Sequence, residues 1–62
     1  MQITLKAARV NAGLTQQQVQ QATGIARSTL ISWEHGKTSP KATELSKLCE
    51  LYAVGIDRIK IK

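Results

Sequence analysis

Residues 16–36 constrain the fold more than any other part of this 62-residue chain. They read Gln-Gln-Gln-Val-Gln-Gln-Ala-Thr-Gly-Ile-Ala-Arg-Ser-Thr-Leu-Ile-Ser-Trp-Glu-His-Gly. Thr15, just before them, is a good N-cap, and Gln18 three residues later can complete a capping box. Gly24 can adopt the left-handed backbone that ends a helix at low cost. The segment therefore predicts a helix, a tight glycine turn and a second helix.

Helix formers, helix breakers and apolar spacing predict helices along most of the chain. Gly13 and Gly36 are placed to end two of them. Pro40 disfavours helix at the residue before it, so residues 37–41 are expected to form a loop. An apolar stripe at helical spacing marks the helix that follows the loop, at Leu45, Leu48, Cys49 and Tyr52. The predicted helices are residues 5–12, 16 to 22 or 23, 26 or 27 to 35, 42–52 and 56–59.

These segments predict an all-α fold, a compact bundle of about five short helices that forms one domain over residues 1–62. The two ends leave two alternatives open. Gln2–Leu5 and Ile59–Lys62 each alternate apolar and polar residues, as half-buried strands do. The termini either pair as two short strands or are the frayed ends of the flanking helices.

Composition favours an acidic partner, with nucleic acid first, because the net charge is +5 at pH 7. Phe is absent, and Trp33 and Tyr52 are the only aromatic residues. The core is therefore expected to consist of Leu, Ile, Val and Ala. Stacking of single-stranded bases on an aromatic platform is not expected.

Other functional classes lack the residues they need. Cys49 is the only cysteine, so an internal disulfide is excluded and a Cys/His metal cage would lack ligands. The four acidic residues show no spacing for paired acid–base work, and His35 has no second histidine beside it. No apolar run approaches the roughly 18–20 residues that span a bilayer, and no leader precedes the first helix. We therefore expect a reduced, cytoplasmic protein that is not an enzyme and has no metal or cofactor.

A set of residues occurs in a characteristic order and spacing: Leu-Thr-Gln at 14–16, Gly24, then Trp-Glu-His-Gly-Lys at 33–37. Further matching positions are Arg9, Gly13, Val19, Ile25, Leu30 and Pro40. Through these residues the chain resembles the Cro/repressor-type (XRE-like) helix-turn-helix family of bacterial and phage regulators, over about residues 5–59. The resemblance implies a lambda-repressor-like bundle that binds duplex DNA with the second helix of the motif in the major groove.

In the pose that this resemblance implies, one face of the helix starting near residue 27 meets the base edges. Arg27 can bond bidentately to guanine O6 and N7, Ser28 and Ser32 can bond to several bases, and Ile31 can pack on a thymine methyl group. The alternative is a solvated helix face with one arginine on it.

Phosphate contacts form a second predicted set. Gln16 opens the first helix of the motif, where free N–H groups and the helix dipole favour a phosphate. The resemblance adds His35, Lys37, Thr38 and Lys41, and Lys6 near the first helix can contribute. The alternative for each lysine is a charge that serves only solubility. The resemblance also implies a mostly buried ion pair between Arg9 and Glu34, which is structural rather than catalytic.

The expected function is that of a transcriptional repressor that binds a pseudo-palindromic operator, in the bacterial nucleoid or a phage-infected cell. A short Cro-like phage repressor and a truncated repressor domain both match the sequence. We expect a weak homodimer or a dimer formed on DNA, with an apolar surface that could equally cap the core: Val54, Ile56, Ile59 and Ile61. The alternative function is a protein-interaction module, as in an antitoxin subunit or an antirepressor.

Four positions depart from the family pattern. Gln20 replaces a small residue, so it either turns outward or holds two helices further apart. Thr23 replaces an aliphatic residue and thins the core. Ala53 stands where glycine or asparagine usually forms a left-handed cap. Gly55 replaces a Ser or Asp N-cap, which predicts a poorly defined last helix.

Overall fold

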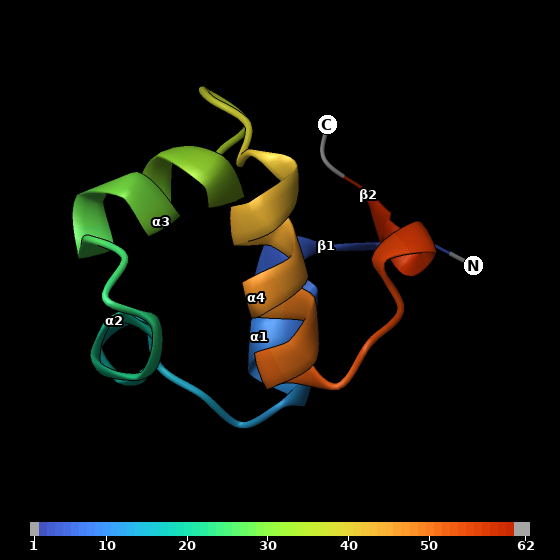
Figure 1. Cartoon of the computed structure of the whole chain (residues 1–62), viewed down its shortest axis with the longest axis horizontal. Helices are drawn as coiled ribbons and strands as arrows, with labels where there is room; N and C mark the ends of the chain where they lie inside the picture. Colours follow the sequence, from blue (N-terminus) through green and yellow to red (C-terminus); the bar gives the residue numbers. More distant parts are fainter. Residues whose placement is uncertain (1, 61–62) are drawn as a thin grey trace.

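Local sequence chemistry accounts for most element boundaries in the computed structural model, which describes residues 2–60. The elements are β1 (Ile3–Thr4), α1 (Leu5–Asn11), α2 (Gln16–Thr23), α3 (Arg27–Glu34), α4 (Ala42–Tyr52), the 3-10 helix η1 (Ile56–Arg58) and β2 (Ile59–Lys60). In Figure 1, α2 and α3 lie on one side of α1 and α4, while η1 and the strands lie on the other.

The helix ends follow the predicted capping chemistry. The Thr15 hydroxyl accepts from the Gln18 N–H at 3.1 Å, and the Gln18 side chain accepts from the Thr15 N–H at 2.8 Å. Gly24 ends α2 with φ of 77°, in the left-handed region where glycine is favoured. The capping box and the glycine turn are therefore confirmed.

The prediction of about five helices was one too many for the described residues. Residues 56–58 form a single 3-10 turn, in which the Arg58 N–H donates to the Gly55 carbonyl at 3.0 Å. Ile59 is already extended, with φ of −88° and ψ of 128°. An α-helical turn has no room between Gly55 and the strand that begins at Ile59.

The termini pair as strands, which decides between the two alternatives for the chain ends. β1 and β2 run parallel, with Ile3 opposite Ile59 and Thr4 opposite Lys60. Ile61 lies outside the described residues. The strand pair joins the two ends of the described chain beside α1 (Figure 1).

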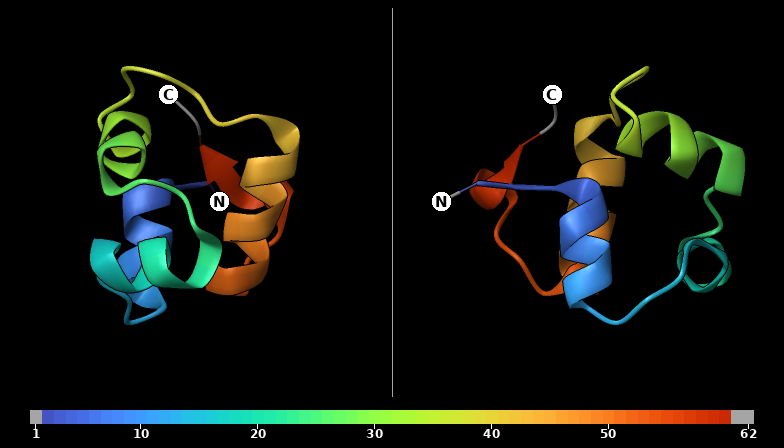
Figure 2. Two further views of the ribbon diagram at one scale, coloured as in Figure 1. Left: turned by 60° about the vertical axis from the view of Figure 1, so that its left-hand side comes forward. Right: turned by 180° about the vertical axis from the view of Figure 1, so that it is seen from behind.

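The core lies among all four α-helices and β2. Helix α1 packs against both α3 and α4, and Figure 2 shows α1 and α4 side by side. Leu30 and Leu48 are 1% exposed, and Val19 is fully buried. The remaining buried apolar residues are Leu5, Ala8, Trp33, Leu45, Cys49, Tyr52 and Ile59.

The departures from the family pattern have local solutions. Gln20 is exposed, so it turns outward. The Thr23 hydroxyl donates to the Val19 carbonyl at 2.8 Å and accepts from the Ile25 N–H at 3.2 Å, which satisfies a polar group at the edge of the core. Ala53 adopts the left-handed cap itself, with φ of 57°. This conformation is strained for a residue with a Cβ atom.

Candidate nucleic-acid interface

Helix α3 is anchored along one face and open along the other. Leu30 and Trp33 fill the core from this helix, while Arg27 and Ser28 are exposed in its first turn. Ile31 and Ser32 are partly buried further along. No side chain caps the start of α3, because its N-cap residue is Ala26. The first-turn N–H groups and the Arg27 and Ser28 side chains are therefore available to a ligand.

The far end of α3 is held by the expected ion pair. Arg9 Nε donates to Glu34 Oε2 at 2.8 Å and Arg9 Nη2 donates to Oε1 at 3.3 Å. The Arg9 and Glu34 side chains are 11% and 3% exposed. Arg9 Nη1 also donates to the Leu14 carbonyl at 2.9 Å, which ties the loop before α2 to the same pair. The hydrogen bond to Glu34 raises the pKa of Arg9, against the opposing effect of burial.

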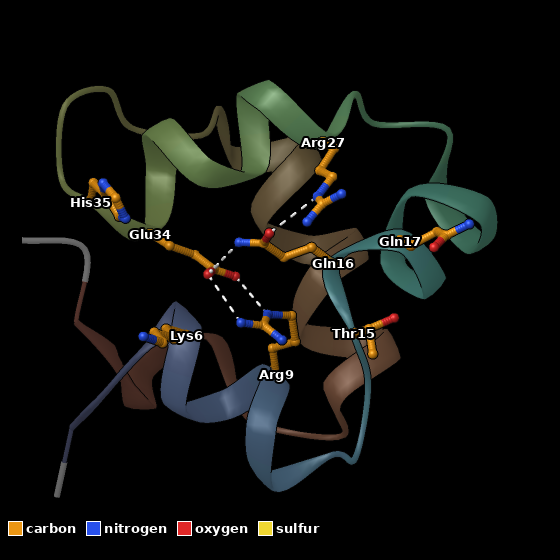
Figure 3. A pocket seen from close by; sticks show the side chains of 8 residues that line it. All are labelled: Lys6, Arg9, Thr15, Gln16, Gln17, Arg27, Glu34 and His35. Atoms are coloured by element: carbon orange, nitrogen blue, oxygen red, sulfur yellow. Dashed lines mark hydrogen bonds and ion pairs between the residues drawn. The ribbon is translucent and has the colours of Figure 1, made fainter.

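Gln16 joins this pair to the start of α3. Its Nε2 donates to Glu34 Oε1 at 3.1 Å, and its Oε1 accepts from Arg27 Nε at 3.4 Å. Figure 3 shows the Gln16 amide between the Glu34 carboxylate and the Arg27 guanidinium. From its sequence position, Gln16 was expected only at a phosphate, and neither of its side-chain partners was predicted. A carboxylate can accept more hydrogen bonds than Arg9 alone donates to Glu34. The expected Arg9–Glu34 pair therefore already implied that Glu34 needs a further donor, and Gln16 is that donor.

An open pocket of about 460 Å³ surrounds the ion pair. It is lined by residues from α1, from the start of α2 and from both ends of α3: Lys6, Arg9, Thr15, Gln16, Gln17, Arg27, Glu34 and His35 (Figure 3). Three cationic side chains and one carboxylate line it, so the pocket has a positive balance of charge. It lies at the N-terminal end of α2, where the helix dipole adds further positive potential.

The pocket brings together only part of the predicted phosphate set. Lys6, Gln16 and His35 line it, whereas Lys37, Thr38 and Lys41 do not. Those three residues are exposed in the loop after α3 and at the start of α4. The predicted set therefore divides into a pocket group and a loop group.

The apolar residues near the C-terminus were expected either to form a dimer surface or to cap the core, and the described ones differ in their burial. Ile59 is 6% exposed and belongs to the core, because its strand position turns it toward α1. Val54 is partly buried against the core, while Ile56 is 48% exposed. Ile61 lies outside the described residues. Of the predicted surface, Ile56 is thus the large side chain that the described structure leaves open.

Residues 2–60 hold no cluster of three His, Cys, Asp or Glu residues that could bind a metal ion. None of their helices is both long and apolar enough to cross a bilayer.

The chain matches a known protein family. The family model described as helix-turn-helix matches residues 5–59. The matched range runs from the first residue of α1 to the first residue of β2 and includes the ion pair, the pocket and the exposed turn of α3. Comparisons with curated proteins and with solved structures gave no match.

Proposed function

Because the chain belongs to the helix-turn-helix family of DNA-binding regulators, we propose that it is a sequence-specific repressor that reads duplex DNA with α3. The observation that carries the proposal is the exposed first turn of α3 beside a cationic pocket. An uncapped helix start with Arg27 and Ser28 on it is shaped to enter the major groove.

Base reading is assigned to the exposed face of α3. Arg27 bonds to guanine O6 and N7, and Ser28 contacts the neighbouring base. Ile31 and Ser32 are partly buried, so they can contact only those bases that approach the middle of α3 closely. Ile31 packs there on a thymine methyl group and Ser32 donates or accepts a hydrogen bond.

Phosphate binding is assigned to the two groups of polar and basic residues. The pocket group, Lys6, Gln16 and His35, receives one phosphate at the start of α2. The loop group, Lys37, Thr38 and Lys41, contacts further phosphates along the same DNA strand. These contacts position α3 and carry no sequence information of their own. They make binding weaken steeply as salt rises.

The operator is proposed to be pseudo-palindromic, with two copies of the chain on half-sites about 10 bp apart. Among the described residues of the predicted dimer surface, Ile56 is well exposed and Val54 is partly buried, which supports a weak contact between copies. The two copies therefore meet chiefly on the DNA.

Selection of duplexes from a random pool at about physiological salt tests the proposal. Recovery of a two-fold repeat with half-sites about 10 bp apart is the expected result. Weak, salt-sensitive binding without any enriched sequence would contradict it. That outcome would favour the alternative, a helix-turn-helix module that binds another protein.

A further inference from the structure

A lysine without a role in the proposed interface lies at the end of the described chain. Lys60 is exposed on β2, one residue beyond the part of the chain that matches the helix-turn-helix family. Together with His35 and Gly36, it lines a hollow of about 150 Å³ at the C-terminal end of α3. Because Lys60 lies outside the family match, its role has to follow from the geometry of this chain.

The strand pair fixes the position of Lys60. In the parallel pairing of β1 with β2, Thr4 lies opposite Lys60. Thr4 is also the N-cap of α1, where its hydroxyl accepts from the Ala7 N–H at 3.0 Å. The preceding residue, Ile59, is buried in the core, and successive side chains of a strand point to opposite faces. Lys60 is therefore tied to the start of α1, with its side chain turned away from the core.

The hollow beside Lys60 lies between the two groups of predicted phosphate contacts. It shares Glu34 and His35 with the cationic pocket that holds the pocket group. It also includes Gly36, and the next residue, Lys37, begins the loop group. Lys60 therefore lies where the two groups approach each other.

No partner among residues 2–60 neutralises the ammonium group of Lys60. Among these residues, Glu34 is the acidic residue that lines the hollow, and Lys60 forms no ion pair with it. Glu34 is 3% exposed and already accepts from Arg9 and Gln16. A lysine is a point charge on a flexible stem, so it can reach a phosphate oxygen without the fixed geometry that an arginine fork provides.

We propose that Lys60 is a further phosphate-contact residue, which joins the pocket group and the loop group into one cationic surface for the DNA backbone. This inference rests on the proposed function of α3. The contact carries no base preference, because phosphates are the same in every sequence. It depends on the pairing of the two chain ends and not on the helix-turn-helix motif itself.

The test is the salt dependence of duplex binding by Lys60→Gln, which removes one positive charge from an exposed position. We expect the slope of log affinity against log salt to fall by about one. Lys47→Gln is the matched control, because it removes the same charge and Lys47 lines a separate groove with Ala22 and Leu51. Equal slopes for Lys60→Gln and Lys47→Gln would overturn the inference.

A conservative variant separates the charge of Lys60 from its place in the strand. Lys60→Arg keeps the charge and should keep the slope of the unmodified chain. If Lys60→Arg loses as much slope as Lys60→Gln, the strand rather than the charge is responsible, and the phosphate contact is wrong. Thermal unfolding of both variants shows whether the strand pair tolerates the changes.

Phosphate ethylation interference on the selected operator locates the contact. Ethylation of a phosphate that the protein contacts weakens binding, and this effect disappears in a variant that has lost the contact. We expect Lys60→Gln to lose interference at one phosphate in each half-site, and Lys6→Gln at a different one. The same interference pattern for Lys60→Gln and the unmodified chain would overturn the inference.

The outcomes distinguish failure of this inference from failure of the proposed function. If the unmodified chain selects an operator and Lys60→Gln keeps its slope, only the Lys60 contact is wrong. If the unmodified chain binds duplexes without any enriched sequence, the proposed function fails, while the slope still tests Lys60 because a phosphate contact acts on every duplex. If the unmodified chain binds no duplex, both fail.

Discussion

The two ends of α3 differ in almost every physical respect. At its C-terminal end, Glu34 is 3% exposed and accepts hydrogen bonds from Arg9 and Gln16. At its N-terminal end, Arg27 is exposed and no side chain caps the helix. One short helix thus has a fixed end and an open end. The buried end fixes its direction, and the open end is the part to which we assign DNA contact in the proposed function.

The largest expected effect comes from breaking the buried end. Glu34→Ala leaves the Arg9 guanidinium nearly buried without its carboxylate, and removing one partner of such a pair costs about 3–5 kcal/mol. Arg9→Ala should cost a similar amount. Chemical denaturation measures the loss. If both variants unfold at the same denaturant concentration as the unmodified chain, the pair does not hold α3 in place.

Alkaline pH should disturb the same end. Tyr52 is 4% exposed, and burial, followed by the negative charge of Glu34, raises its pKa to about 12. Because the usual tyrosine pKa is about 10, the neutral form is favoured by the fold. Its contribution is complete below about pH 10 and is lost as the pH rises toward about 12.

The slope of stability over this range should be at most about 1.4 kcal/mol per pH unit. Tyr52→Phe removes the titrating group and should flatten the pH dependence between about 10 and 12 relative to the unmodified chain. Thermal unfolding at a series of alkaline pH values measures the difference. Parallel curves for the two proteins would show that Tyr52 is not responsible.

A matched pair of substitutions at two left-handed helix caps changes stability in opposite directions. Ala53 has φ of 57° and Gly24 has φ of 77°. Ala53→Gly relieves the strain of the left-handed conformation and should stabilise the fold by roughly 1 kcal/mol, whereas Gly24→Ala should destabilise it by about as much. Ala53→Gly should leave DNA affinity unchanged. A shift of the two melting temperatures in the same direction would contradict this account of the caps.

The smallest expected effect concerns one phosphate contact beside the open end. Lys6 lines the cationic pocket, and Lys6→Gln should weaken binding to all duplexes equally and reduce the salt slope by about one. Lys47 lines a separate groove with Ala22 and Leu51, so Lys47→Gln is the control and should leave the slope unchanged. Titrations at several salt concentrations distinguish them. Equal salt slopes for Lys6→Gln and Lys47→Gln would show that Lys6 does not contact a phosphate.

The fold was predictable where one residue or a short spacing decides the structure. The Thr15–Gln18 capping box, the turn at Gly24 and the bounds of α4 follow from local chemistry. The pairing of Ile3 with Ile59 was open, because alternation alone does not name a distant partner strand. It also does not say which face is buried, so the choice for Ile59 between a dimer surface and the core stayed open, and the structure places Ile59 in the core.

The candidate site was also predictable only in part. Arg9 and Glu34 were expected to pair from the family resemblance, and they do. The contacts of Gln16 with Glu34 and Arg27 were not expected, because they depend on how closely α2 approaches both ends of α3. The base and phosphate contacts remain predictions for Arg27, Ser28 and the basic residues around them.

Parallel selection of random duplexes by the unmodified chain and by Arg27→Ala tests the central claim most directly. The account predicts that both recover the same two-fold site, and that the variant loses its preference at one base pair in each half-site while its unfolding temperature is unchanged. Identical preferences at every position for the two proteins would contradict the assignment of base reading to the open end of α3.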